Sequence, residues 1–172
     1  DALQKQRELH PGFFDRVDKT LTNLEREARK YNLGYIEMDG EIGVIGNGAG
    51  LNLATLDMLK YHNLNPANFL EVSGRTYSIA DKALEIIVKK PGVRLVFGNF
   101  FGCISRCDVI AKGLISALKK NVLPENIPMI IAMRGNGAEE GLKLLREEVP
   151  YIELFDDDES AISRIKEILC DL

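Results

Sequence analysis

The sequence of 172 residues has no tryptophan, only two histidines and three cysteines, and no excess of positive charge. Its 22 Lys and Arg residues are outnumbered by 26 Asp and Glu residues, which gives a net charge of -4. Without a basic surface there is no electrostatic reason to expect binding to nucleic acid or to an anionic membrane. No apolar run approaches the roughly 20 residues that span a bilayer, and nothing resembles a signal peptide. We therefore expect neither nucleic acid nor membrane among the partners.

The three cysteines are Cys103, Cys107 and Cys170. An odd number fits no disulfide framework, so we predict a reducing compartment, either a cytoplasm or a mitochondrial matrix. Cys103 and Cys107 have a spacing that could hold a metal ion, but both histidines, His10 and His62, lie far away in the sequence. We therefore interpret the paired thiols as buried apolar side chains and predict no metal site.

The chain does contain enough hydrophobic residues, 45%, for one good core. Hydrophobic spacing predicts a surface helix over 11–32, then short strands over 35–39 and 41–46 joined as a hairpin at Asp39-Gly40. Further helices are predicted over 50–62, 78–90, 106–120, 138–148 and 158–170, and further strands over 68–72, 93–98, 128–133 and 151–155. The strand segments "LVFG" and "MIIAM" are apolar throughout, as in parallel strands buried on both faces. The pattern predicts an α/β fold, a flavodoxin-like doubly wound parallel sheet of five strands, preceded by a helical segment and the short hairpin.

Glycine is concentrated where predicted strands lead into helices. The four junctions concerned are "GNGAG" 46–50, "EVSGRT" 71–76, "GNFFGCISRCD" 98–108 and "MRGNGAEEG" 133–141. Any one of them could be a tight turn and nothing more. Ligands of doubly wound folds bind outside the carboxyl ends of the strands, so several such loops along one sheet edge indicate a binding site.

The first junction precedes an apolar helix and predicts an anion site, because unpaired N–H groups and the positive end of the helix dipole face a ligand there. A dinucleotide loop is an alternative, since Glu71 ends the next strand where a ribose-binding acid would lie. Gly46 and Gly48 match that motif, but Leu51 stands where a small residue is required. A P-loop does not fit, because no Gly-Lys-Ser/Thr follows.

The run "LGYIEMDGEIGVIGNGAGLNLATLDMLKYHNLNPANFLEVSG" closely resembles the carboxy-terminal domain of the β subunit of succinyl-CoA synthetase and related ADP- or GDP-forming acyl-CoA ligases. "FGCISRCDVIAKG" and "GNGAEEG" resemble two further loops of the same family, in the same order. The resemblance covers roughly residues 33–170. It implies a CoA-ligase domain over 35–172, with 1–34 as the tail of a preceding grasp-type domain or a connecting helix.

The resemblance also implies a reaction shared between subunits. A grasp domain of the same β subunit uses ATP or GTP with Mg to phosphorylate a histidine of an α subunit. That phosphohistidine converts an organic acid to an acyl phosphate, and CoA, bound by the α subunit, takes the acyl group. We accordingly expect no catalytic residue in this chain, no cofactor bound by this domain alone, and His62 as a surface or capping residue.

Site residues follow from the same resemblance. The backbone N–H groups of Gly48, Ala49 and Gly50 are expected to face the phosphoryl group at a helix start, and Asn47 is expected to contribute to the pocket for the acid.

The segment Cys103, Ile104 and Ser105 stands where the family carries Gly-Ile-Val in its acid-binding loop. Arg134 stands where succinyl-CoA synthetases tend to carry an acidic residue. These departures resemble ATP-citrate lyase and citryl-CoA synthetase, so we expect all four side chains to bind the acid and keep citrate or another polycarboxylate as an alternative to succinate. A non-catalytic nucleotide-binding module and a purely structural docking domain are further alternatives.

Overall fold

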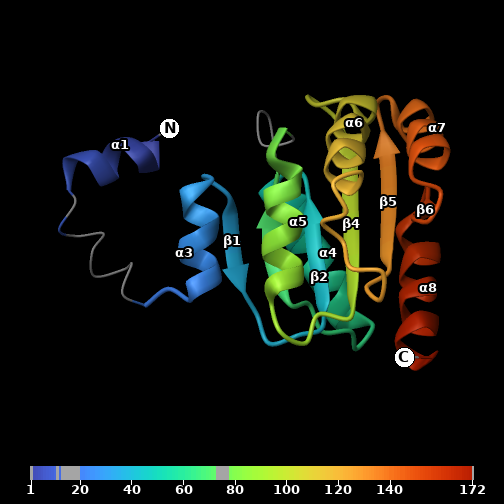
Figure 1. The fold of residues 1–172 in the computed structure, drawn as a ribbon, viewed down its shortest axis with the longest axis horizontal. Helices are drawn as coiled ribbons and strands as arrows, with labels where there is room; N and C mark the ends of the chain where they lie inside the picture. Colours follow the sequence, from blue (N-terminus) through green and yellow to red (C-terminus); the bar gives the residue numbers. More distant parts are fainter. Residues whose placement is uncertain (1, 11, 13–19, 73–77, 172) are drawn as a thin grey trace.

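The computed structural model describes residues 2–10, 12, 20–72 and 78–171, and its centre is a six-stranded sheet of order β1-β3-β2-β4-β5-β6 (Figure 1). The strands are β1 (Gly34–Glu37), β2 (Ile42–Gly46), β3 (Asn68–Glu71), β4 (Leu95–Gly102), β5 (Met129–Gly135) and β6 (Glu153–Phe155). β2 to β6 are parallel, and β1 is antiparallel to β3. The five parallel strands have the flavodoxin-like order 2-1-3-4-5, which confirms the predicted fold class.

The predicted hairpin is wrong, because β3 lies between β1 and β2 and pairs with both. The chain does turn at Asp39-Gly40, but the turn bonds to the segment before β3: Met38 N donates to Ala67 O at 2.8 Å and Gly40 N to Pro66 O at 3.0 Å. An Asp-Gly pair predicts a change of direction and does not determine which strand pairs with which.

Helices cover both faces of the sheet, and Figure 1 shows α5 and α6 in front of it and α4 behind. The described helices are α1 (Ala2–Leu9), α3 (Asn23–Lys30), α4 (Ala49–Tyr61), α5 (Ala80–Lys89), α6 (Cys107–Leu118), α7 (Ala138–Glu148) and α8 (Asp158–Asp171). One buried cluster joins α3, α5, α6 and α7 to the sheet through residues such as Phe100 and Leu114. The other joins α4 and α8 to the opposite face through Phe97, Leu59 and Ile162. Both faces of β4 are therefore buried, as its apolar sequence predicts.

The predicted helix over 11–32 lies partly outside the described residues, and its described part is shorter than predicted. Thr22 is the N-cap of α3: its Oγ1 accepts from Glu25 N at 3.2 Å, and Glu25 Oε2 accepts from Thr22 N at 2.9 Å. This capping box starts the helix at Asn23 because each side chain satisfies one free backbone N–H group. None of the described helices has the length and apolar character that a membrane span requires.

Buried asparagine side chains replace part of the backbone pairing in the sheet. Asn68 of β3 exchanges two hydrogen bonds with Val44 of β2, accepting from its N at 3.1 Å and donating to its O at 2.8 Å. Asparagine can do this because its amide carries the same donor and acceptor as a peptide group.

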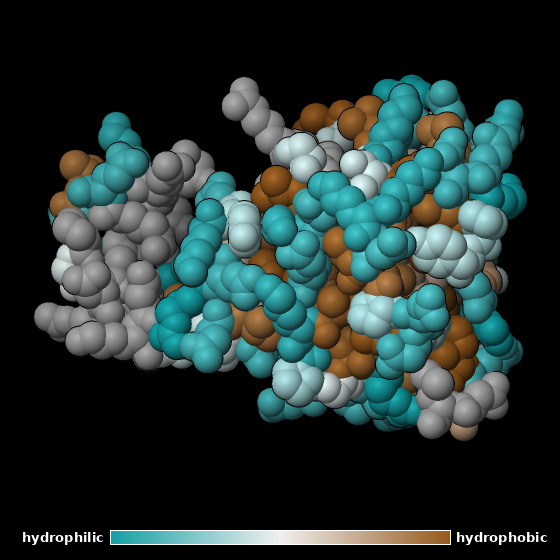
Figure 2. Space-filling view, in the orientation of Figure 1, coloured by the Kyte–Doolittle hydropathy of each residue, from teal (hydrophilic) through white to brown (hydrophobic). Residues whose placement is uncertain are grey.

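From the side of α5 and α6 the surface is mostly hydrophilic, but hydrophobic residues reach it along the upper edge, where the parallel strands end (Figure 2). Two exposed apolar residues lie there, Phe101 near the end of β4 and Ile104 in the loop that follows, and Ile104 is 98% exposed. The candidate site lies at this carboxyl edge of the sheet.

Candidate functional site

The crevice of the sheet lies between the carboxyl ends of β2 and β4. β2 leads into α4 on one face, and its neighbour β4 leads into α6 on the other face. In doubly wound sheets, neighbouring strands whose connections leave on opposite faces form the crevice in which ligands bind. Predicted site residues lie on both of its sides, on the glycine junction after β2 and on the loop after β4.

Asn47 bridges the two sides of this crevice. Its Nδ2 donates to Phe101 O at 2.8 Å, and its Oδ1 accepts from Phe101 N at 2.8 Å. Both halves of the amide are thus engaged by the backbone of β4. The expected contact between Asn47 and an organic acid stays a prediction, and in this structure the side chain holds the crevice at its base.

The start of α4 is open. Gly48 is its N-cap with φ +89, and no side chain caps the helix. A Cβ added at Gly48 or Gly50 would meet no atom of the described residues within 4 Å. The N–H groups of Ala49, Gly50 and Leu51 precede the first bond of the helix, from Asn52 N to Gly48 O, so they have no acceptor within the helix and lie at the positive end of its dipole.

Gly46 has a different reason to be glycine. A Cβ there would lie 2.5 Å from Asn52 Oδ1 and 2.6 Å from Asn99 O. Asn52 is buried and donates from Nδ2 to Leu70 O at 2.8 Å, which ties the first turn of α4 to β3. Close packing explains the glycine at Gly46 and a positive φ explains the one at Gly48, whereas the described packing does not require glycine at Gly50.

The charge of the first turn separates α4 from its neighbours. Among the helices that follow the five parallel strands, each of the other four has an acidic residue in its first turn, and α4 has none. Carboxylates in a first turn already compensate the helix dipole and repel anions. The N-terminus of α4 is therefore the one among these described helix starts that is suited to a phosphate or carboxylate.

The loop after β4 exposes two of its three predicted site residues. Cys103 and Ile104 are exposed, and Ser105 is half-buried. Cys103 was predicted to be a buried thiol and that prediction is wrong, because the loop carries it past the end of the sheet. Cys107, at the start of α6, is buried with its Sγ 3.1 Å from Arg134 O, and burial raises the pKa of this thiol. Among the described residues, no group of three His, Cys, Asp or Glu side chains could hold a metal ion.

Arg106 is a residue that the sequence analysis missed. It donates to Asp108 Oδ1 at 2.8 Å, to Asn136 Oδ1 at 3.1 Å and to Glu140 Oε2 at 3.2 Å. It therefore joins the loop after β4 to the loop after β5, which are also linked by a bond from Asn136 N to Gly102 O at 2.8 Å. The Arg-Cys-Asp run beside a second glycine-rich loop was the available signal.

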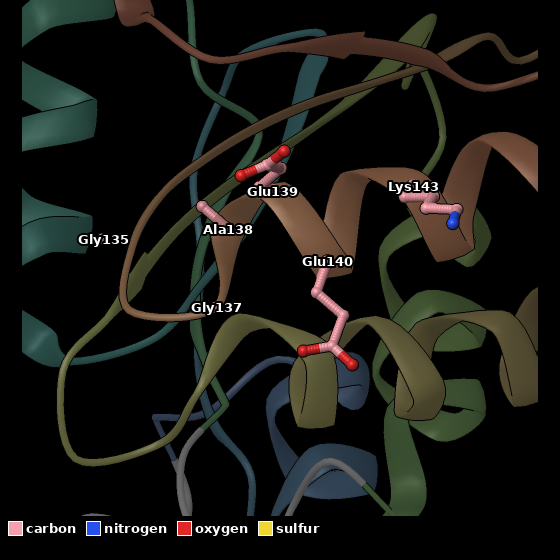
Figure 3. A pocket seen from close by; sticks show the side chains of 6 residues that line it. All are labelled: Gly135, Gly137, Ala138, Glu139, Glu140 and Lys143. Atoms are coloured by element: carbon pink, nitrogen blue, oxygen red, sulfur yellow. The ribbon is translucent and has the colours of Figure 1, made fainter.

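A cavity of about 500 Å³ lies at the start of α7 (Figure 3). Its lining consists of Gly135, Gly137, Ala138, Glu139, Glu140 and Lys143. Figure 3 shows the two carboxylates leaving the helix in different directions, with Lys143 one turn further on. Two carboxylates in the first turn make this cavity a poor site for an anionic group.

Arg134 lies beside the crevice on the sheet face that α4 and α8 cover. Its Nη2 donates to Asn99 Oδ1 at 3.2 Å, and its Nη1 forms an ion pair with Asp158 Oδ1. Asn99 is buried, and its Nδ2 donates to Thr55 Oγ1 of α4 at 2.9 Å. The expected contact of Arg134 with an acid stays a prediction, and an acid would have to compete with Asp158 for the guanidinium.

His62 is the C-cap of α4, which confirms the capping role predicted for it. Its Nδ1 lies 2.9 Å from Lys166 Nζ of α8. It belongs to the end of α4 opposite the glycine junction, so the two are separated by the length of the helix.

Comparison with known proteins agrees with this geometry. A family model described as CoA-ligase matches residues 45–156, which include the glycine junction and both loops. The succinate--CoA ligase (ADP-forming) subunit beta of Ignicoccus hospitalis is 37% identical over 150 residues, covering 86% of this chain and 39% of the relative. The same subunit of Sulfurimonas denitrificans is 43% identical over 140 residues, covering 80% and 35%.

The chain thus spans less than two-fifths of the length of these curated relatives. Among solved structures, an ATP citrate lyase from Methanothrix soehngenii, in complex with citrate and coenzyme A, matches with a TM-score of 0.68 at 18% identity, covering 89% of this chain and 46% of its own. At that identity the likeness concerns the fold alone.

Proposed function

This chain belongs to the CoA-ligase family, and we propose that it forms the carboxy-terminal domain of the β subunit of a nucleoside-diphosphate-forming succinate–CoA ligase. In this proposal the rest of the β subunit, a grasp domain, binds ATP or GTP with Mg. The α subunit carries the phosphorylated histidine and the CoA site. The three free cysteines suit a reducing compartment, a cytoplasm or a mitochondrial matrix.

The role of this domain is to hold the phosphoryl group and the acid at the crevice between β2 and β4. The observation that carries the proposal is the start of α4, which is uncapped, glycine-lined and free of acidic residues. There the N–H groups of Gly48, Ala49 and Gly50 can donate to phosphoryl oxygens. Cys103, Ile104 and Ser105, on the other side of the crevice, would contact the acid.

Succinate is the proposed acid because the relatives at 37% and 43% identity are named for it. The citrate-bound neighbour shares the fold but only 18% of its residues. Thioester formation by the complete two-subunit enzyme, assayed side by side with succinate, malate and citrate, decides between these acids.

A phosphate titration followed by ¹⁵N-resolved NMR tests the anion site. We expect the amide signals of Gly48, Ala49 and Gly50 to shift and saturate, while those of Ala138 and Glu139, at the acidic start of α7, do not. Sodium chloride at matched ionic strength is the control. Shifts confined to α7, or none at all, would contradict the proposal. Saturation of the same signals by NADH at far lower concentration would instead favour a nucleotide-binding module.

A further inference from the structure

A network of polar contacts runs along one face of the sheet, from α8 to the start of α4. Asp158 of α8 holds the guanidinium of Arg134, Arg134 donates to Asn99 of β4, and Asn99 donates to Thr55 of α4. Thr55 in turn donates to Leu51 O, in the first turn of the same helix, at 2.8 Å. The network of contacts therefore starts at α8 and ends at the first turn of α4, which carries the proposed anion site.

The middle of this network of contacts is buried. Asn99 and Thr55 are each 1% exposed, so water does not replace a contact that is lost there. An amide can rotate to present either its oxygen or its nitrogen to Thr55. The guanidinium of Arg134 has only donors, so it can bond to Asn99 only through the amide oxygen. The Nδ2 group of Asn99 is thereby turned towards α4. Asp158 fixes the position of the arginine by its opposite charge.

We propose that Arg134 is a positioning residue, which acts through Asn99 and Thr55 to hold the first turn of α4 in place for the phosphoryl group. This inference rests on the proposed function of the α4 start. It assigns to Arg134 a role other than binding a carboxylate of the acid. Asp158 is a second positioning residue in this proposal, because without its carboxylate the guanidinium of Arg134 is free to leave Asn99.

The test must distinguish a loss of positioning of α4 from the change in charge that a substitution causes. Removing Arg134 removes a positive charge, which weakens anion binding by Coulomb's law alone. Thr55→Val removes the hydroxyl without any change of charge, and Thr55→Ser keeps it. Asp158→Asn removes a negative charge, so a pure charge effect would strengthen anion binding and a positioning effect would weaken it.

In the phosphate titration of this chain, we expect Thr55→Val and Asp158→Asn to weaken binding at Gly48, Ala49 and Gly50 by about 2- to 30-fold. Thr55→Ser should stay within about twofold of wild type. Arg94→Met is the matched control: Arg94 also forms a partly exposed ion pair, with Glu41 at 2.8 Å, but at the opposite end of β4. Tighter binding by Asp158→Asn together with unchanged binding by Thr55→Val would overturn the proposal.

Hydrogen exchange at Asn52 N, which donates to Gly48 O at 3.1 Å, gives a second measure that needs no ligand. Thr55→Val and Asp158→Asn should speed it up, and Arg94→Met should not. If wild type binds no phosphate at α4, the proposed function fails, and this exchange still decides whether Arg134 positions the helix. Unchanged exchange in both variants would overturn the inference by itself.

Kinetics of the complete enzyme separate positioning from acid binding. Arg134→Met should lower kcat with succinate and with citrate by a similar factor and leave both KM values within about twofold. A rise in KM confined to citrate would instead assign Arg134 to the additional carboxylate of that acid and overturn the positioning role.

Discussion

Asn47 and Phe101 exchange two hydrogen bonds of 2.8 Å across the crevice, so that a side-chain amide takes the place of the next backbone pair between β2 and β4. The regular pairing of the two strands ends one residue earlier on the β2 side, at Gly46 and Asn99. The crevice therefore begins where the amide of Asn47 closes the sheet, and everything beyond this point can open to a ligand.

Replacing Asn47 by aspartate tests this arrangement. The carboxylate can still accept from Phe101 N, but it faces Phe101 O with a second acceptor in place of a donor. We expect the free energy of unfolding in urea to fall by about 1–3 kcal/mol. Asn65→Asp is the control, because Asn65 is exposed and its side-chain oxygen accepts from Lys60 Nζ, a bond that a carboxylate can also accept. Equal stability of the two variants would mean that the Asn47 bridge contributes nothing.

Gly50→Ala separates folding from binding at the start of α4. The new methyl group meets no atom within 4 Å, and alanine is the better helix former, so the variant should be more stable by about 0.5–1 kcal/mol. The same methyl group should hinder a phosphate that approaches the backbone and weaken the titration. Gly34→Ala, also in open space but outside the site, serves as the control. A stabilised variant with unchanged phosphate affinity would show that the ligand does not approach Gly50.

Alkylation should distinguish the three thiols. Iodoacetamide is expected to modify the exposed Cys103 and Cys170 of the native chain, and to reach the buried Cys107 only after unfolding. Burial raises the pKa of Cys107, which further lowers the fraction of reactive thiolate. Peptide mass spectrometry after timed labelling measures this. Fast labelling of Cys107 would contradict the packing of α6 described above.

Tyr35 should make stability depend on pH in alkali. Its hydroxyl is buried and has no hydrogen-bond partner among the described residues, and burial, with smaller contributions from Glu37 and Glu25, raises its pKa. The unfolded chain ionises near pH 10, so the full stability is present below about pH 10 and falls as the pH rises towards the folded pKa.

Tyr35→Phe should remove this alkaline loss, and at pH 7 it should be neutral or stabilising by up to about 1 kcal/mol, because it removes an unpaired buried hydroxyl. Urea unfolding between pH 7 and 11 measures both effects. The control is Tyr151→Phe, at an exposed tyrosine. A destabilised Tyr35→Phe variant would indicate that the hydroxyl has a partner.

Incubation with radiolabelled ATP should leave this chain unlabelled. Its two histidines are an exposed His10 and the C-cap His62, and neither lies at the glycine junction. The complete two-subunit enzyme, expected to acquire acid-labile phosphate on its α subunit, is the positive control. Acid-labile phosphate on His10 or His62 would overturn the proposed division of labour.

The type and order of most helices and strands after residue 34 can be predicted from local sequence patterns. Consecutive apolar residues in β4 and β5 predicted burial on both faces, and glycine before α4 predicted an open helix start. These features depend on neighbours along the chain, through periodicity, capping and backbone freedom, so local sequence contains the information. The placement of the junction at the carboxyl edge followed from the parallel order alone.

The partners of the strands and of the polar side chains become known from the three-dimensional fold. β1 pairs with β3 and not with β2, because β3 inserts between them and local turn chemistry does not select a distant strand. The predicted contacts of Asn47 and Arg134 with an organic acid stay predictions. The structure adds that Asn47 bonds to Phe101 and that Arg134 bonds to Asn99 and Asp158, which lie between 24 and 54 positions away along the chain. A donor or acceptor takes the nearest matching group in three dimensions, and that distance is set only when the sheet has formed.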